Sequence, residues 1–196
     1  MIGAVLRSAG ANVELLPVVE DDASAHRAAL ERGLEADVLV SSGGVSMGPH
    51  DLVRRVAADL GVEEVFWGVA MKPGKPLSFG VRGATLVFGL PGNPVSSLVG
   101  ALVFVRPALL RRQGVEKIDL DYYHGRTTAS LARNPHRDEF VRARRRLEET
   151  DVVLEPVSGQ ESHMIVRAAS ADALVHVPRG EGEIAPGAAV RFLSLA

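Results

Sequence analysis

Apolar residues in the first half of the chain recur three and four positions apart, which is the spacing that one face of an α-helix requires. This spacing predicts helices over residues 2–9, 26–36, 51–61 and 95–112. Asp21 or Asp22 can cap the second helix, and Pro49 suits the first turn of the third. Asn93 followed by Pro94 is a cap and a first-turn proline for the fourth.

Between the helical stretches lie short apolar runs, which predict strands over residues 12–17, 37–41, 63–71, 77–81 and 84–89. Strands that alternate with helices are typical of α/β proteins, so we expect a three-layer α/β domain over residues 1–113. Such a layer normally begins with a strand that the first helix covers, whereas this chain begins on a helix. We therefore expect an N-terminal part of the domain to be missing.

After residue 113 the pattern changes to alternation of apolar and polar residues, as in TTASLAR, EFVRARRRL, DVVLEPV and ALVHVP. This pattern predicts a small all-β barrel over residues 114–196, with the domain boundary near residues 114–119. Arg142, Arg144 and Arg146 share one face of a predicted strand, and we expect that face to be solvated.

Composition excludes several classes of function. The net charge of −2 and the pI near 6.3 give no electrostatic footprint for nucleic acid or for an anionic membrane, so we expect neither as a partner. The chain has no cysteine, which excludes disulfides and thiolate metal sites. No signal peptide pattern opens the chain, and we expect a cytoplasmic protein.

The stretch SSGGVS, residues 41–46, joins a predicted strand to a predicted helix. Backbone N–H groups at such a turn can receive an anion, and glycine lets a ligand approach the backbone closely. The turn matches neither the dinucleotide nor the P-loop pattern. Two interpretations remain open, a tight connection that needs glycine for its backbone angles and an anion site formed by Ser41, Gly43, Gly44 and Ser46.

Two acidic residues near this turn also have two interpretations. Asp51 lies in the first turn of a predicted helix, where a carboxylate stabilises the helix by about 0.3–1 kcal/mol through the helix dipole. Beside an anion site, the same carboxylate could hold a cation such as Mg²⁺. Asp22 is likewise either a helix cap or an active-site acid.

Two proline-glycine loops follow predicted strands. KPGKP places Lys72 and Lys75 on a stiffened loop, where both can face one phosphate or oxyanion, or simply point into solvent. LPGNP contains Pro91, Gly92, Asn93 and Pro94, which a capped helix start also explains. We expect both loops at one edge of the sheet beside the SSGGVS turn, where open α/β sheets bind ligands.

Three motifs, SSGGVSMGPHD, WGVAMKPGKPLSFG and FGLPGNPVSSL, together resemble in order and spacing the molybdenum-inserting enzymes of molybdenum cofactor synthesis, the MoeA and gephyrin E-domain family. VVEDD, GQESHM and RGEGEIAPGAAV also resemble that family, so that the resemblance covers essentially the whole chain. The double-glycine turn alone is shared with pterin adenylyltransferases.

The resemblance implies a molybdopterin-binding domain followed by a C-terminal β-barrel domain. The implied reaction inserts molybdate into adenylylated molybdopterin and releases AMP, with Mg²⁺ assisting. The implied catalytic residues are Asp22, Asp51, Lys72 and Lys75, with Asp51 also holding the metal. The implied ligand-binding residues are Ser41, Gly43, Gly44, Ser46, Pro91, Gly92, Asn93, Pro94 and Ser162.

The family also carries two further N-terminal domains and a TGDEL-like segment, neither of which is present in these residues. We therefore expect a C-terminal portion that works with those domains or as a homodimer. Two alternatives to the transferase are a non-catalytic pterin-binding or scaffold module and a molybdopterin adenylyltransferase.

Overall fold

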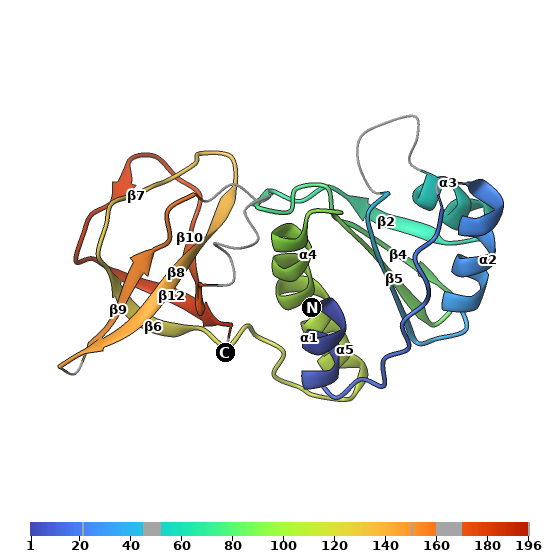
Figure 1. Ribbon diagram of the computed structural model, residues 1–196, viewed down its shortest axis with the longest axis horizontal. Helices are drawn as coiled ribbons and strands as arrows, with labels where there is room; N and C mark the ends of the chain where they lie inside the picture. Colours follow the sequence, from blue (N-terminus) through green and yellow to red (C-terminus); the bar gives the residue numbers. More distant parts are fainter. Residues whose placement is uncertain (21, 45–51, 150, 160–169, 196) are drawn as a thin grey trace. The chain divides into compact units, whose positions relative to one another are not determined.

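The computed structural model describes residues 1–20, 22–44, 52–149, 151–159 and 170–195. Its contacts divide the chain into two compact units (Figure 1). The first consists of residues 1–69 and 74–118, and the second of residues 70–73 and 119–196.

The first unit is a three-layer α/β/α arrangement, as the sequence predicts (Figure 1). Its central sheet has the strand order β1-β5-β4-β2, with β1 and β5 parallel and the other neighbours antiparallel. The strands are β1 (Val38–Ser42), β2 (Glu63–Trp67), β4 (Ser78–Arg82) and β5 (Thr85–Leu90). The helices are α1 (Ile2–Ser8), α2 (Ala23–Gly33), α3 (Leu52–Asp59), α4 (Pro94–Gly100), a π-helical stretch η1 (Ala101–Val105) and α5 (Arg106–Arg112).

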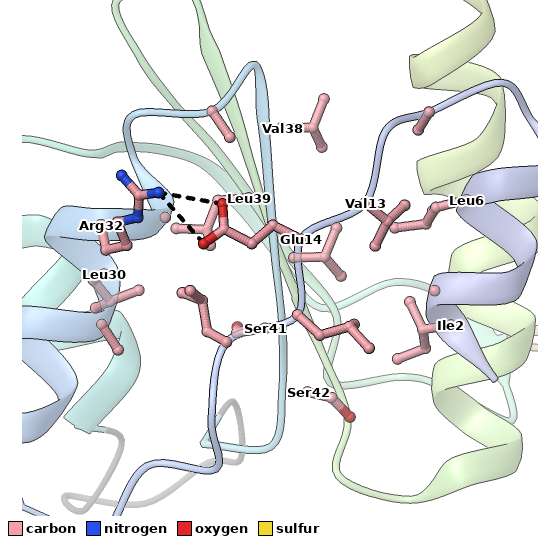
Figure 2. Close-up of a pocket in the computed structure, with 18 of the residues that line it drawn as sticks. Ile2, Leu6, Val13, Glu14, Leu30, Arg32, Val38, Leu39, Ser41 and Ser42 are labelled. Carbon is pink, nitrogen blue, oxygen red and sulfur yellow. Dashed lines mark hydrogen bonds and ion pairs between the residues drawn. The ribbon is translucent and has the colours of Figure 1, made fainter.

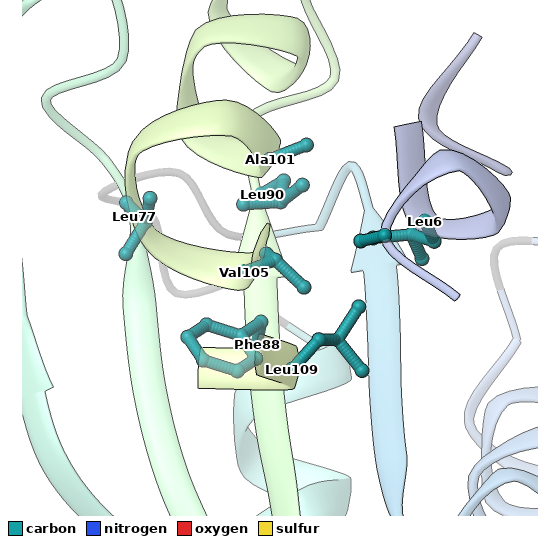
Figure 3. Close-up of a cluster of buried hydrophobic side chains, with 8 residues drawn as sticks. Leu6, Leu77, Phe88, Leu90, Ala101, Val105 and Leu109 are labelled. Carbon is teal, nitrogen blue, oxygen red and sulfur yellow. The ribbon is translucent and has the colours of Figure 1, made fainter. Parts of the chain in front are cut away.

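Each face of the sheet carries its own apolar cluster. On one face, α1 and the α4–η1–α5 rod pack over the strands, where Leu90, Ala101 and Val105 are fully buried (Figure 3). On the other face, α2 and α3 bury Leu30 and Val56. The rod is long and apolar enough by length and composition alone to cross a membrane, but its apolar side chains are used in this core.

The predicted caps are present. Asp22 accepts a hydrogen bond from the backbone N–H of Ala25 at 2.9 Å and so begins α2. Asn93 accepts from Val95 N–H at 3.2 Å and Ser96 N–H at 3.5 Å, with Pro94 in the first turn of α4. Both helices therefore begin where a side-chain oxygen satisfies free backbone donors.

Two predicted strands of the first half are wrong. Residues 12–17 belong to no strand, because no neighbouring strand pairs with them among the described residues. The strand predicted over residues 63–71 ends at Trp67, where Gly68 takes a positive φ of 84° and its N–H turns back to Leu77 O at 2.8 Å. Met71–Lys72 is a separate strand, β3, that belongs to the second unit and pairs with β8 (Asp138–Glu148).

The second unit is a small barrel, which confirms the all-β prediction. The strand order β10-β12-β6-β9-β8 closes on itself because β8 also pairs with β10, and β3 adds to the free edge of β8. Its strands are β6 (Tyr123–Thr127), β8 (Asp138–Glu148), β9 (Asp151–Pro156), β10 (Ala173–Val177) and β12 (Ala189–Ser194). A two-stranded sheet pairs β7 (Leu131–Ala132) with β11 (Glu183–Ile184), so that TTASLAR spans the end of β6, a bend and β7.

One arginine of the barrel departs from expectation. Arg144 and Arg146 are exposed, but Arg142 on the same strand is 2% exposed and donates from Nη2 to Gly159 O at 2.7 Å. The predicted solvated face is therefore wrong at its first position, because the chain beyond β9 folds over it and supplies a carbonyl acceptor.

A partly buried polar network joins strands β8, β10 and β12 of the barrel. His176 is 6% exposed and is stacked between the rings of Tyr122 and Phe140. Its Nδ1 accepts from Arg191 Nε at 2.9 Å, so the ring proton lies on Nε2, which donates to Asp138 Oδ2 at 3.1 Å. The other Asp138 oxygen accepts from the N–H of Arg179 at 2.8 Å, so that all these polar groups are paired.

We predict that Asp138→Asn destabilises the barrel most at neutral pH. Desolvation raises the pKa of Asp138, but the hydrogen bonds from Arg179 and His176 outweigh it and lower this pKa below its usual 3.8. A lowered folded pKa stabilises the fold above that range and loses this effect as pH falls through it. The substitution should cost about 1–3 kcal/mol near pH 7, because asparagine has no charge and only one acceptor oxygen for the two N–H donors of His176 and Arg179.

Urea unfolding followed through NMR signals of β10 at several pH values measures this cost. The cost should begin to shrink below about pH 4 and reach its minimum below the lowered folded pKa of Asp138, where both proteins carry a neutral group at residue 138. A cost that stays constant down to pH 3 would show that the carboxylate charge is not what stabilises the network.

Candidate functional site

The first unit gathers its loops at one edge of the sheet. β1 and β5 are parallel, and their register pairs Ser42 with Leu90, so both strands end together. The antiparallel pairs extend this alignment, because Gly89 lies opposite Ser78 and Ser78 lies opposite Trp67. The SSGGVS turn, the LPGNP loop and the β2–β4 connection therefore all leave from the same edge, as expected.

At this edge the turn after β1 and the loop after β5 meet backbone to backbone. Gly43 N–H donates to Leu90 O at 3.0 Å, which continues the strand pairing into the turn. A methyl group on Gly92 would lie 3.4 Å from Gly43 Cα, and Gly92 is exposed. Since neither glycine has a side chain, peptide groups form the surface here, and a ligand can approach them directly.

Both glycines of the turn after β1 have left-handed backbone angles. Gly43 has a φ of 97° and Gly44 a φ of 66°, which side chains rarely allow. A Cβ on Gly44 would also lie 2.4 Å from Val53 Cγ2, in the helix that follows. The structural interpretation of these glycines is therefore correct, and it is compatible with the anion-binding interpretation.

Two serines that the sequence analysis did not single out fasten the two loops together. Ser97 is 1% exposed, and its Oγ donates to the carbonyl oxygen of Pro91 and lies 3.1 Å from Asn93 O. Ser42 Oγ lies 3.2 Å from both Ser97 Oγ and Pro91 O. The available signal was a polar pair, Ser96–Ser97, inside an otherwise apolar helix, because a buried hydroxyl needs a partner.

The two predicted residues with a capping interpretation do act as caps. The side-chain oxygen of Asn93 is occupied by the start of α4. The hydrogen bonds from Ser24 and from Ala25 N–H lower the pKa of Asp22, so its carboxyl group is ionised over the physiological range. Asp22 begins α2, which a short connection joins to the start of β1, so Asp22 lies toward the end of the layer where β1 ends.

The two lysines of KPGKP differ in surroundings. Lys72 belongs to β3 in the second unit, and its Nζ lies 3.2 Å from Glu139 Oε2. Lys75 belongs to the first unit, where its carbonyl oxygen accepts from Val69 N–H at 3.0 Å and its side chain is exposed. No partner for the Lys75 ammonium group lies within the described ranges.

Three predicted residues, Ser46, Asp51 and Ser162, lie outside the described residues. Across the part of the chain that the structure describes, no cluster of three His, Asp or Glu side chains could hold a metal ion. The described edge consists of peptide groups, hydroxyl groups and the exposed Lys75. This set suits an oxyanion rather than a bare cation.

Comparison with known proteins finds the same order of domains. Residues 1–111 match the family model described as a probable molybdopterin binding domain, and residues 124–195 match the MoeA C-terminal region, domain IV. The chain is 34% identical over its whole length to molybdopterin molybdenumtransferase 2 of Mycobacterium tuberculosis, of which it covers 49%. It is 30% identical over 90% of its length to the molybdopterin molybdenumtransferase of Haemophilus influenzae, of which it covers 43%.

A solved structure agrees with these matches. The molybdopterin biosynthesis MoeA protein from Pyrococcus horikosii has a TM-score of 0.81 and 28% sequence identity over 98% of this chain. The match covers 46% of that structure's chain. The chain thus spans about half the length of the relatives that it matches.

We predict that Gly44→Ala destabilises the first unit more than Gly61→Ala does. Both glycines have a positive φ, which costs an alanine about 1–2 kcal/mol. Nothing lies within 4 Å of a Cβ on Gly61, whereas a Cβ on Gly44 overlaps Val53. Overpacking of this kind costs about 1–3 kcal/mol more.

Urea unfolding followed by the fluorescence of Trp67, the single tryptophan, reports on this unit. Equal losses in the two variants would contradict the predicted contact between the turn and α3.

Proposed function

The chain belongs to the family of probable molybdopterin-binding domains, which residues 1–111 match, and on this premise we propose that it acts in molybdenum cofactor biosynthesis. The proposed reaction inserts molybdate into adenylylated molybdopterin with release of AMP. The MoeA C-terminal region and the names of the relatives support this reaction over others that use the same first domain.

One observation supports the proposal most directly. The turn after β1 and the loop after β5 contact each other through Gly43 and Gly92, which leaves an edge of peptide groups without side chains. A phosphate of the pterin nucleotide needs such a surface, because N–H donors other than that of Gly43, which is bonded to Leu90 O, can then reach its oxygens. Ser42 and Ser97 keep the two loops in register and so hold these donors in place.

The roles we propose follow this geometry. The turn residues Ser41, Gly43, Gly44 and Ser46 hold the phosphate region, and the loop Pro91–Pro94 forms the opposite wall. Lys75, which is exposed at the same edge, binds an anionic group, and Lys72 does so once Glu139 releases it. Ser162, which the resemblance to the family implies, is the remaining ligand-binding residue of the proposal.

A divalent ion, Mg²⁺, is part of the proposal. The described residues provide no complete set of carboxylate ligands, so Asp51 would hold the ion together with oxygens of the substrate. Mg²⁺ is commonly bound in this way, by one or two carboxylates and substrate phosphates. Such an ion would neutralise charge on the phosphate groups. Asp22 supports the site as an ionised cap of α2 and, in this proposal, as an acid that faces the substrate.

We further propose a cytoplasmic protein that works as a homodimer or with the N-terminal domains of its longer relatives. Because it spans about half of those relatives, we expect the isolated chain to bind adenylylated molybdopterin but to release AMP negligibly. Small misplacements of reacting groups can cost about a hundredfold in rate.

AMP release from adenylylated molybdopterin, with molybdate and Mg²⁺, tests the reaction. We expect release when the N-terminal half of a relative is supplied in trans, and none from ATP with molybdopterin. Release from ATP instead would support an adenylyltransferase, and binding without release under any condition would support a scaffold module.

The Asp22→Asn variant separates the capping role of Asp22 from its proposed role as an acid, because asparagine keeps the cap and removes the acid.

We predict that Lys72→Ala combined with Lys75→Ala weakens binding of adenylylated molybdopterin about 10- to 100-fold. One hydrogen bond to a charged group contributes about 1.5–3 kcal/mol, and about 1.4 kcal/mol is a factor of ten in affinity. Lys75→Ala alone should cost more than Lys72→Ala alone, since Lys72 is already paired with Glu139.

Calorimetry at low salt measures both effects, and the exposed Lys117→Ala serves as the matched control because it removes the remaining lysine. Equal affinities of the double variant and the control would remove these lysines from the site.

A further inference from the structure

A groove of about 1380 Å³ runs along the free edge of β1 (Figure 2). Residues 38–44 line one side of it and residues 10–19 the other. Small-molecule pockets commonly measure about 300–1,000 Å³, so this groove is larger than a site for one small ligand. We propose that it is a slot for one apolar β-strand of polypeptide, which runs parallel to β1 and ends beside the Ser41–Gly44 turn.

Most backbone groups that face the groove lack partners among the described residues. There, β5 is the only strand that pairs with β1, so the opposite edge of β1 is unpaired. Residues 12–19 form no helix or strand and their N–H groups donate to no described residue, although Val13 O accepts from Arg7 Nη2 at 3.4 Å. Unpaired edges of this kind are templates for another strand.

Residues 12–19 nevertheless remain in the layer of the sheet. On one face, a methyl group on Gly3 of α1 would lie 3.6 Å from Val13 and 3.4 Å from Leu15. On the other face, Arg32 of α2 reaches Glu14 at 3.4 Å (Figure 2). Helices thus lie on both faces of the first part of this segment, but the groove separates the segment from β1 and leaves Leu15 71% and Val18 101% exposed.

The walls of the groove indicate the character of the occupant. Ile2 and Leu6 of α1 line it from one face and Leu30 of α2 from the other, while Val38 and Val40 are only half-buried. A strand in this position is covered on both faces, and such strands are apolar throughout.

Charged ligands fit the groove poorly. Arg32 is paired with Glu14 and Glu35, and Arg112 is paired with Asp37 at 2.6 Å. The positive charges of both arginines in the lining are therefore already neutralised by carboxylates of the chain. We accordingly expect the middle of the occupying strand to be uncharged.

The direction of the occupant follows from α1. Gln113 donates to Ala9 O at 2.8 Å, and the adjacent Arg112 pairs with Asp37, so the end of α1 lies at the start of β1. The start of α1 therefore lies near the end of β1, where Figure 2 places Ile2 near Ser42. A strand parallel to β1 would have its carboxyl end there, next to α1, as in the usual strand–helix–strand connection.

A strand joined to α1 by a short loop is the occupant to which we commit. The relatives that match this chain are about twice its length and contain further polypeptide. A strand in the slot would end beside the candidate site, so the site edge gains a further segment when the slot is filled. The inference rests on the groove and the unpaired edges and is independent of the pterin reaction.

The test uses the full chain labelled with ¹⁵N and the synthetic peptide Lys-Val-Ile-Val-Ile-Val-Gly-Lys, without any pterin. We expect saturable shifts of the amide signals of residues 12–19 and 38–42, and exchange of the unpaired β1 amides slowed by about tenfold or more. The same peptide with alternate backbone amides N-methylated is the matched control, since it keeps the side chains and loses the donors.

A spin label on the carboxyl end of the peptide should broaden Gly43 and Gly44 rather than Asp37. Broadening of Asp37 would overturn the parallel direction, and equal binding of the N-methylated peptide would overturn a strand altogether. Protection of the β1 amides without peptide, rising with protein concentration, would assign the slot to a second copy of the chain.

Since an apolar peptide can aggregate, a second measurement joins the same strand to Met1 through a short Gly/Ser loop. The midpoint of urea unfolding, followed by Trp67, should rise relative to a fusion whose central isoleucine is proline, because proline cannot donate to β1. Equal midpoints of the two fusions, together with no binding of the free peptide, would refute the proposal.

Discussion

The parallel pairing of β1 with β5 is the constraint on which the candidate site depends. It aligns Ser42 with Leu90, and the bond from Gly43 N–H to Leu90 O carries that alignment one residue into the turn. A shift of one residue in this pairing would reverse the faces of one strand relative to the other and separate Gly43 from Gly92. The geometry of the loops is therefore a property of the sheet more than of the loops themselves.

Polar groups around this pairing fix the two loops of the candidate site. Ser97, Pro91 and Ser42 form a small hydrogen-bonded cluster in which the buried hydroxyl of Ser97 has carbonyl partners. The side chain of Asn93 caps the start of α4 and so fixes where the loop ends. These side chains thus fix the backbone of the two loops, and in the proposed site the backbone contacts the ligand.

Local signals in the sequence predicted much of this. Asp22, Asn93 and Pro94 marked helix starts because capping involves residues only a few positions apart. The unusual backbone angles of Gly43 and Gly44 were predictable, because adjacent glycines between a strand and a helix indicate a tight turn. The periodicity change near residue 113 predicted the all-β character of the second half, and the barrel confirms it.

Long-range partners could not be predicted from local pattern. The extended residues 12–17 read as a strand, but a strand also needs a neighbour to pair with. Arg142 follows the alternating pattern of β8 but is buried, because its guanidinium group donates to the carbonyl oxygen of Gly159, which lies beyond β9.

Strand β3 has a consequence for folding during synthesis. At the ribosome, Met71 and Lys72 emerge long before their partner strand β8, so β3 has no strand to pair with while only the first half has been made. The fold of KPGKP is therefore completed late, only after the barrel has been made.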